Sequence, residues 1–454
     1  MPGAVVVQTV QTLVSAMLRL LERAHPAKLA LLGYLSYSLI GWLLLCIPWV
    51  HKAGVQVSVL DNLFIATSAM STTGLVTVSV SDSYNLAGQV IVLLLIQLGG
   101  IGYMTFGSFV VLSTKGTLTQ ARTLVGKTVF SLPESFRVDK FIRSVIFFTL
   151  LIESAGAFAL YPILESAGDT SPAWSAIFHS VSAFCTAGFG LYNNSFENFA
   201  AHFWLNAVLS VLSFLGAVGF IVLVDYWRWL TGKVQRITLT SKIIISMTVW
   251  MIALGTLLVL FVEPSLRDRP PEERLLTAFF QAITAMTTAG FNTVPIGTLS
   301  KATLLILLLL MFIGASPSGT GGGVKSTTIS ALLGVMRSAL RGSQEITFWK
   351  HPVPIPRVLT AIAAIGFYSV MLLFGTFLLE LTQSFAFEQN LFEAASALGT
   401  VGLSTGITAS LSPLGKLVVI FLMLTGRMGP ITFSMALFFE SPEDTETSDG
   451  DLAV

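Results

Sequence analysis

The stretch FQAITAMTTAG, residues 280–290, has three counterparts elsewhere in the chain. They read FIATSAMSTTG at 64–74, FHSVSAFCTAG at 178–188 and FEAASALGTVG at 392–402. All four begin with Phe, carry Ala at the sixth position and Thr at the ninth, and end with Gly. Agreement at this many positions indicates an internal fourfold repeat.

Long apolar stretches surround these four copies. Of the 454 residues, 54% are hydrophobic and 11% are charged, whereas a soluble domain carries about 25% charged residues. Each stretch is near the length that crosses ~30 Å of hydrocarbon as a helix. They cover 29–50, 89–113, 145–163, 203–226, 243–262, 303–315, 358–380 and 417–439. The alternative, a large soluble protein with buried helices, does not account for so many of them.

Each copy of the repeat is too short to cross a bilayer, so we expect a short helix that enters the membrane and returns. Irregular backbone at that depth is tolerated only beside protein or a water-filled cavity. Asp61 is the predicted cap of the first short helix, Ser171 and Pro172 start the second, and Pro270 and Pro271 lead into the third. Four such helices would converge with their negative C-terminal dipole ends, which attracts a cation.

The sequence therefore predicts an all-α integral membrane protein with eight transmembrane helices and four re-entrant pore loops. Four helix–pore loop–helix repeats, at 27–113, 141–230, 243–340 and 356–440, would surround one pore with pseudo-fourfold symmetry. Segment 1–26 precedes them as a cytoplasmic or interfacial segment, and the acidic segment 441–454 follows as a cytoplasmic tail. Most of the 25 Lys and Arg residues lie in the connections on one side of the predicted spans, the side that also holds both termini. Positive residues remain in the cytoplasm, so both termini are predicted to be cytoplasmic.

The turn that ends each copy carries the predicted ion chemistry. Glycine permits backbone conformations closed to other residues and leaves room for carbonyls to face an axis. Four such turns form a ring of carbonyl oxygens that replaces the hydration shell of a cation. The alternative is that each glycine only caps its helix. The predicted selectivity filter comprises Thr72, Thr73, Gly74, Thr186, Ala187, Gly188, Thr288, Ala289, Gly290, Thr400, Val401 and Gly402.

A second glycine-containing element follows each copy, beginning at Gly99, Gly216, Gly314 and Gly426. In the third repeat it extends into a loop in which no continuous helix can form, and which we expect to lie beneath the filter. Its polar side chains would bond neighbours across the closed pore. This predicted gate comprises Gly314, Ala315, Ser316, Pro317, Ser318, Gly319, Thr320, Gly321, Gly322 and Gly323. A Walker-type phosphate motif is not formed, because Val324 replaces the glycine required before Lys325.

Arg427 lies inside the last apolar stretch, where a guanidinium costs from ~3 to over 10 kcal/mol on different scales. In one interpretation it faces the cavity as an electrostatic barrier to cations that the 314–323 loop modulates. In the other it forms a structural ion pair with a buried carboxylate such as Glu153 or Asp225.

Other classes of function find less support in the sequence. A secondary transporter of an organic solute also uses repeats and broken helices, but it usually has two pseudo-symmetric halves. The chain carries no HExxH motif, and Cys46 and Cys185 are its only cysteines, so we expect no enzyme activity. The net charge of +1 gives no basic bias towards nucleic acid.

Through the four copies, QLGGIG at 97–102, the stretch 314–326 and GRMGP at 426–430, the sequence resembles the Ktr/Trk/HKT superfamily of potassium transporters. The resemblance covers residues 27–440 and is greatest to the Ktr-type membrane subunit. It implies that Gly74, Gly188, Gly290 and Gly402 select K⁺. In HKT relatives that carry sodium the first of these is serine, so Gly74 favours potassium.

The resemblance also implies the biological setting. It suggests potassium uptake across the cytoplasmic membrane by a homodimer that sits on a cytoplasmic ring of nucleotide-binding regulatory subunits. Potassium is the transported ion, and the resemblance leaves open whether Na⁺ acts as an activator. We expect no organic cofactor in this chain, and membrane lipid but no nucleic acid among its partners.

Overall fold

The computed structural model describes residues 26–102, 138–342, 346–348 and 351–429, together with the isolated residues 105, 108, 112, 432 and 433. The acidic segment 441–454 and, apart from Pro26, the N-terminal segment 1–26 lie outside the described residues. So do Lys115, Arg122, Lys127 and Arg137, which lie between the first and second repeats.

Four times along the chain, a long helix is followed by a short helix, a turn and a further helix. The long helices are α2 (Pro26–Leu45), α8 (Val138–Ser166), α12 (Leu239–Val262) and α16 (Ile355–Thr382). The short helices are α3 (Val59–Met70), α9 (Pro172–Phe184), α13 (Pro271–Met286) and α17 (Phe387–Gly399). The further helices are α5 (Leu86–Ile101), α10 (Phe203–Val218), α14 (Lys301–Phe312) and α18 (Pro413–Met428).

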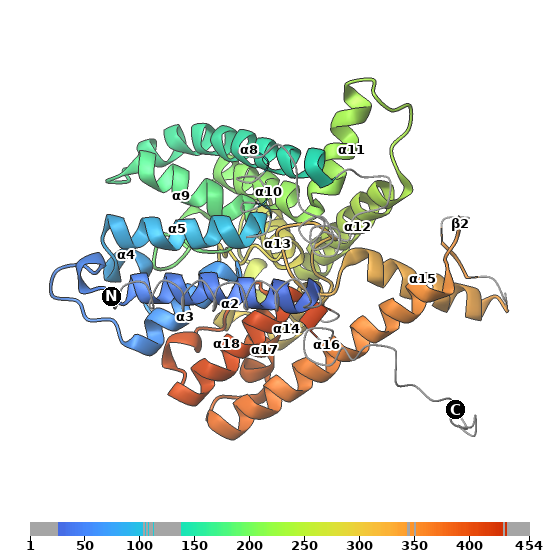
Figure 1. The fold of residues 1–454 in the computed structure, drawn as a ribbon. Helices are drawn as coiled ribbons and strands as arrows, with labels where there is room; N and C mark the ends of the chain where they lie inside the picture. The colour runs from blue at the N-terminus through green and yellow to red at the C-terminus, as the bar shows by residue number, and fades with distance from the viewer. Residues whose placement is uncertain are drawn as a thin grey trace, which may run out of the picture.

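The remaining elements are connections. They comprise α4 (Val80–Ser83), α11 (Phe220–Leu230), α15 (Ser326–Leu340) and 3₁₀ turns at Pro48–Val50, Glu197–Phe199, Pro264–Leu266, Ile296–Thr298 and Thr408–Ser410. The two-residue strands β1 (Thr347–Phe348) and β2 (His351–Pro352) form a small antiparallel hairpin beyond α15 (Figure 1). Apart from this hairpin, the described residues are helical or irregular, which agrees with the predicted all-α class.

The long helices carry the membrane-spanning character. All four are long and apolar enough to cross a bilayer, and the bent pair α10–α11 gives a fifth candidate among the described residues. Their outer faces are apolar and open, with Phe158 81% exposed and Trp250 69% exposed, as contact with lipid requires. The Phe that opens each copy of the repeat packs inside instead, at Phe64, Phe178, Phe280 and Phe392.

The further helices are shorter than the apolar stretches that predicted them. α5, α10 and α18 end at Gly102, Gly219 and Gly429, whose φ angles of 84°, 85° and 79° do not continue a helix. At Gly219 the chain turns by 96° into α11, which leaves the bundle in Figure 1. The sequence predicted one apolar stretch over 203–226 and did not predict this bend. It did predict the break between α14 and α15.

The second glycine element packs these helices onto the short ones. Gly99, Gly216 and Gly426 lie against the backbone carbonyls of Met70, Phe184 and Leu398, at the ends of α3, α9 and α17. A Cβ atom at any of the three would overlap the carbonyl oxygen, so only glycine allows the helices to approach this closely. In the third repeat Gly314 instead contacts Gly322 and Gly323 of the 314–323 loop.

Helix starts agree with the sequence except at α3. Pro172 and Pro271 occupy the first positions of α9 and α13, as predicted. The cap of α3 is Ser58, whose Oγ accepts a hydrogen bond from the Asp61 N–H at 3.1 Å. Asp61 therefore lies in the first turn rather than at the cap. The prediction was wrong because either residue type can cap a helix and only the backbone decides which one does.

Candidate functional site

The four predicted filter turns share one backbone geometry. In the second repeat the Ala187 N–H donates to the Ser182 carbonyl at 2.8 Å and the Thr186 N–H donates to the Ala183 carbonyl at 3.1 Å. The same pair of bonds occurs in the other three repeats. This is a Schellman motif, and Thr rather than Gly occupies its left-handed position. The alternative in which each glycine only caps its helix is therefore wrong.

The threonines are held in a conformation that β-branched residues avoid. Their φ angles are 52° at Thr72, 51° at Thr186, 57° at Thr288 and 49° at Thr400. Such strain costs about 1–3 kcal/mol per residue and persists where the surroundings fix it, often at functional sites. All four side chains are fully buried. Glycine in place of these four threonines would relieve the backbone strain but would also remove their four hydroxyl groups.

The four glycines meet in a closed ring. A Cβ atom at Gly74 would lie 3.0 Å from the Gly188 Cα, one at Gly188 3.2 Å from the Gly290 Cα, and one at Gly290 3.1 Å from the Gly402 Cα. A Cβ at Gly402 would lie 3.1 Å from the Gly74 Cα, which closes the circle. We call these four residues the glycine ring. Each also faces the carbonyl that precedes the next glycine, so none has room for a side chain.

A pocket of about 670 Å³ opens on one side of the glycine ring. It is lined by the four glycines and by the residues that follow them in each repeat. Among these lining residues of the described chain Glu197 is the only one with a charged side chain, and its Oε1 accepts a hydrogen bond from Asn292 Nδ2 at 2.9 Å. Burial raises the pKa of Glu197 above its ordinary value, although the Asn292 hydrogen bond opposes the rise.

The 314–323 loop covers the other side of the glycine ring. Thr320 Oγ1 lies 3.1 Å from Thr186 Oγ1, and Thr72 Oγ1 donates to the Thr320 carbonyl at 3.3 Å. The Gly322 N–H donates to Thr288 Oγ1 at 3.2 Å, and a Cβ at Gly322 would overlap Thr400 Oγ1. The loop thus touches all four of the left-handed threonines. The hydroxyls of these threonines are therefore the contact surface between the filter turns and the 314–323 loop.

The same loop is anchored to the bend between α10 and α11. Ser316 Oγ reaches the carbonyls of Ala217 and Val218, at 2.8 and 2.5 Å. The Ser318 carbonyl accepts from the Phe220 N–H at 3.2 Å, and Ser318 Oγ accepts from the next N–H, at 3.1 Å. Ser318 thereby satisfies N–H groups at the start of α11 that have no partner within the helix.

Arg427 contacts the loop and no carboxylate in the described part of the chain. Its guanidinium donates to Thr72 Oγ1 at 2.9 Å, to the Thr320 carbonyl and to the Gly99 carbonyl. The predicted alternative, an ion pair with Glu153 or Asp225, is therefore wrong. Glu153 bonds to other groups, and Asp225 accepts from the N–H and Oγ1 of Thr238, both at 2.8 Å.

Side chains on the pocket side link each repeat to the next. Asn193 bonds to Ser79 and Asp82, which joins the second repeat to the first. The Glu197–Asn292 contact joins the second to the third. Ion pairs between Lys301 and Glu388, at 2.5 Å, and between Lys416 and Asp61, at 2.6 Å, join the third to the fourth and the fourth to the first. Sequence reasoning singled out none of these contacts, because each depends on how the repeats are ordered around the ring.

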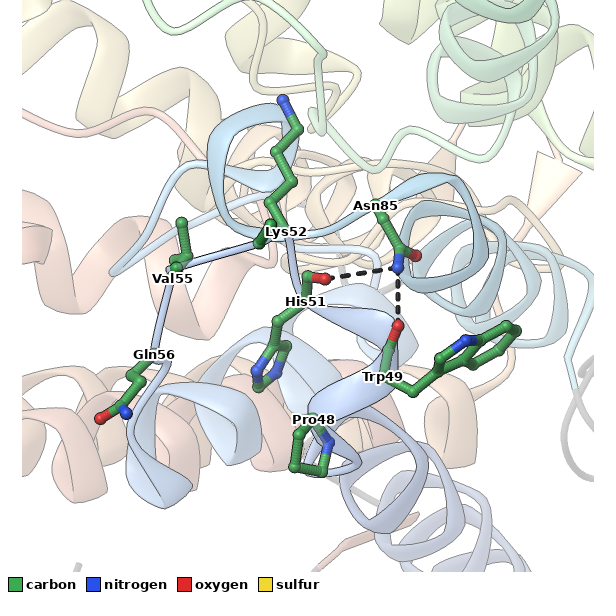
Figure 2. Close-up of a pocket in the computed structure, with 9 residues that line it drawn as sticks. Pro48, Trp49, His51, Lys52, Val55, Gln56 and Asn85 are labelled. Atoms are coloured by element: carbon green, nitrogen blue, oxygen red, sulfur yellow. Dashed lines mark hydrogen bonds between the residues drawn. The ribbon is translucent and has the colours of Figure 1, made fainter.

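A second pocket, of about 700 Å³, lies away from the ring, beyond the end of α2 (Figure 2). Asn85 Nδ2 donates to the carbonyls of Trp49 and His51, at 2.7 and 3.3 Å, and Lys52 points away from Asn85. No predicted filter or loop residue lines it, so it does not belong to the same site.

A family model described as TrkH, cation transport protein, matches residues 42–448. The chain belongs to this family. The transporter is 32% identical over 432 residues to the Ktr system potassium uptake protein B of Vibrio alginolyticus, covering 92% of this chain and 94% of the relative. It is 32% identical over 433 residues to the potassium/sodium uptake protein NtpJ of Enterococcus hirae, covering 93% and 95%.

Among solved structures, the potassium transporter TrkH of Vibrio parahaemolyticus has the same fold. The TM-score is 0.72 at 20% sequence identity, and the match covers 90% of this chain and 83% of that one. Together with the long apolar helices, the family identifies the chain as a multi-pass membrane protein that transports cations rather than an enzyme.

Proposed function

We propose that this transporter takes up potassium and that the glycine ring is its selectivity filter. The observation that carries the proposal is the closed circle of contacts among Gly74, Gly188, Gly290 and Gly402. Backbone carbonyls concentrated around such a circle replace the hydration shell of a cation without contributing a formal charge. The short helices α3, α9, α13 and α17 all end at the ring, so their negative dipole ends favour a cation there.

The choice of potassium rests on the relatives and on the ring itself. The relatives named above are potassium and potassium/sodium uptake proteins. All four ring positions are glycine, and the filter would comprise the Thr-x-Gly turns at 72–74, 186–188, 288–290 and 400–402. Potassium is the transported ion in this proposal, and Na⁺ is an activator to be tested separately.

In the proposed topology the four long helices are four spans, and α5, α10, α14 and α18 begin the other four. The span that begins with α14 is broken at 314–323 and continues in α15, because α14 alone is too short to cross. The four short helices with their turns are the re-entrant loops. Repeat bounds of 27–113, 141–230, 243–340 and 356–440 fit this division. The 670 Å³ pocket would be the outer vestibule. Both termini would lie in the cytoplasm of a cell whose cytoplasmic membrane holds the protein.

The 314–323 loop is the proposed gate. Its contacts with all four threonine hydroxyls support a closed state in which an ion leaving the filter meets the loop. Arg427 would hold that state by its bond to the Thr320 carbonyl and would oppose cations by its own charge. Movement of the loop would have to break these contacts together with those that bind Ser316 and Ser318 to the α10–α11 bend.

The chain would work as a homodimer on a cytoplasmic ring of nucleotide-binding regulatory subunits. The support is its similarity to proteins named as components of a Ktr system. A change in that ring would be transmitted to the gate from the cytoplasmic side.

The proposal is tested with the full chain reconstituted in liposomes, with potassium and sodium varied separately on the two sides. We expect K⁺ flux to exceed Na⁺ flux. In parallel, the chain should restore growth of a potassium-uptake-deficient bacterium at low external potassium. Failure to carry K⁺ in either assay, when the protein is folded and inserted, would refute the proposal. Equal flux of the two ions would refute the assignment of the glycine ring as a potassium filter.

A further inference from the structure

A buried carboxylate lies directly behind the second of the four turns. Glu153 is on the long helix α8, within the apolar segment long enough to span a membrane, and it is 7% exposed. Its Oε1 atom accepts hydrogen bonds from Gln97 Nε2 at 3.0 Å and from Cys185 Sγ at 3.6 Å. Ionisable side chains inside membrane spans are rare and usually functional, and neither the conduction path nor the loop accounts for this one.

Cys185 connects Glu153 to the glycine ring. It is the C-cap residue of α9, directly before the left-handed Thr186 and three residues before Gly188. Its carbonyl accepts a hydrogen bond from Thr186 Oγ1 at 2.8 Å, the same hydroxyl that lies 3.1 Å from Thr320 Oγ1. A contact that fixes the position of Cys185 therefore also fixes the position of the second filter turn.

The other three turns lack this connection. At the position of Cys185 they carry Ser71, Thr287 and Gly399. The Ser71 hydroxyl bonds to the Ser68 carbonyl and to Thr73 Oγ1, and the Thr287 hydroxyl bonds to the Ile283 carbonyl. These bonds stay within the same segment. Among the described residues, only the second repeat ties this position to a side chain of its long helix.

The last turn of α5 lies between this cluster and Arg427. Gln97 in that turn donates to Glu153, while the carbonyls of Gly99 and Gly100 accept from the Arg427 guanidinium. A Cβ at Gly100 would lie 2.5 Å from Cys185 Sγ, so the thiol rests on the α5 backbone. Glu153 therefore holds two neighbours of the pore, the second filter turn and the helix end that bonds to Arg427.

We propose that Glu153 is a positioning residue for cation selectivity, which acts by accepting the Cys185 thiol hydrogen bond and so fixing the second filter turn. The inference rests on the proposed function, because it assumes that the glycine ring selects the ion. Productive geometry in such sites requires that the supporting hydrogen bonds lock the groups that contact the ligand. In the second repeat this support comes from a side chain of the long helix and reaches the residue directly before the left-handed threonine.

Four substitutions distinguish an effect of the Cys185–Glu153 hydrogen bond from an effect of the ionisable carboxyl group. Glu153→Gln keeps an oxygen that accepts from Gln97 and Cys185 but cannot ionise, whereas Glu153→Ala removes the acceptor. Cys185→Ser keeps a donor, and Cys185→Ala removes it. Glu165→Gln is the matched control on the same helix, since within the described residues the Glu165 carboxylate accepts a hydrogen bond from the exposed Tyr161 and none from the filter turns.

Each variant is measured in two ways. Titration of the purified full chain with K⁺ and with Na⁺ by calorimetry gives a binding preference that does not require the gate to open. Flux of the two ions in liposomes gives the transport preference. A thermal melt of each variant shows that it is folded. A merely structural residue would change the melting temperature without changing the ratio of the two ions.

We expect Cys185→Ala to lower the preference for K⁺ over Na⁺ by roughly three- to tenfold, the factor that one ordinary hydrogen bond sets. Glu153→Ala should lower it at least as much, and the double variant should be no worse than Glu153→Ala, because the two act as one unit. Glu153→Gln, Cys185→Ser and Glu165→Gln should stay near the wild-type ratio.

A wild-type ratio in folded Cys185→Ala would overturn the inference, whether or not Glu153→Ala folds. A loss of preference in Glu153→Gln equal to that in Glu153→Ala would also overturn it, since the carboxyl group would then matter rather than the hydrogen bond. If the wild-type protein itself shows no preference for K⁺, the proposed function fails instead, so the two failures are distinguishable.

Discussion

The substitution Gly188→Ala tests the glycine ring at its most tolerant position. A Cβ at Gly188 would lie 2.7 Å from the Ala289 carbonyl oxygen and 3.2 Å from the Gly290 Cα, and its equivalents at the other three positions would lie closer to their carbonyls. Ordinary van der Waals contact begins at 3.4 Å, so the oxygen must move by about 0.7 Å. The methyl group therefore displaces a carbonyl of the neighbouring turn rather than one of its own.

This displacement is large for a binding site. Productive constellations tolerate about 0.5 Å, and a misplacement of ~1 Å in an ordered site can cost on the order of 10²-fold. We expect the preference for K⁺ over Na⁺ to fall by roughly tenfold, because carbonyl selectivity depends on the arrangement of the oxygens. The positive φ of 67° at Gly188 adds backbone strain, which costs about 1–2 kcal/mol of stability for an L-residue.

Gly168→Ala separates the strain from the clash. Gly168 has a φ of 80°, and a Cβ there would meet nothing within 4 Å. Both variants are titrated with K⁺ and Na⁺, assayed for flux in liposomes and melted in detergent. Wild-type discrimination in folded Gly188→Ala would refute the reasoning. An equal loss in Gly168→Ala would do so as well, because strain alone would then explain the effect.

Three further predictions concern charged side chains. Arg427→Gln removes the guanidinium that holds the 314–323 loop, so we expect K⁺ flux in liposomes to rise severalfold; unchanged flux would count against a role in gating. Glu197→Gln should raise the KM for K⁺ uptake by roughly two- to threefold without altering selectivity, because the pocket loses its negative charge. Burial raises the pKa of Glu197, so the carboxylate becomes protonated as pH falls and the KM of the wild type should rise towards that of Glu197→Gln. If Glu197→Gln shows the same dependence of KM on pH as the wild type, the role assigned to Glu197 is wrong. Burial alone would raise the pKa of Asp61, but hydrogen bonds from Lys416 and Ser58 outweigh it and hold the pKa below its ordinary value. A group with a lowered pKa stabilises the fold above its unfolded-state pKa and loses that contribution as pH falls through the folded-state value. The melting temperatures of wild type and Asp61→Asn should therefore converge below about pH 4, and a gap that stays constant with pH would disprove the ion pair's contribution.

Much of the architecture followed from local features of the chain. Apolar length predicted the long helices, and the copies that end in Gly74, Gly188, Gly290 and Gly402 predicted four short helices that stop at a turn. The break at 314–323 was predictable for the same reason, since glycine and proline interrupt a helix wherever the helix lies. The bend at Gly219 was not, because the apolar stretch there continues past the glycine without another local sign.

The sequence by itself determined the presence of four long apolar helices and of four short helices that each stop at a turn, because these features depend on neighbours along the chain. Only the tertiary structure decided that the four glycines form a closed ring, that Arg427 meets Thr72 rather than a carboxylate, and that Glu153 stands behind Cys185. Arg427 and Thr72 are 355 positions apart. Contacts over such separations are set by the packing of whole repeats against one another, and no local pattern of residues specifies them.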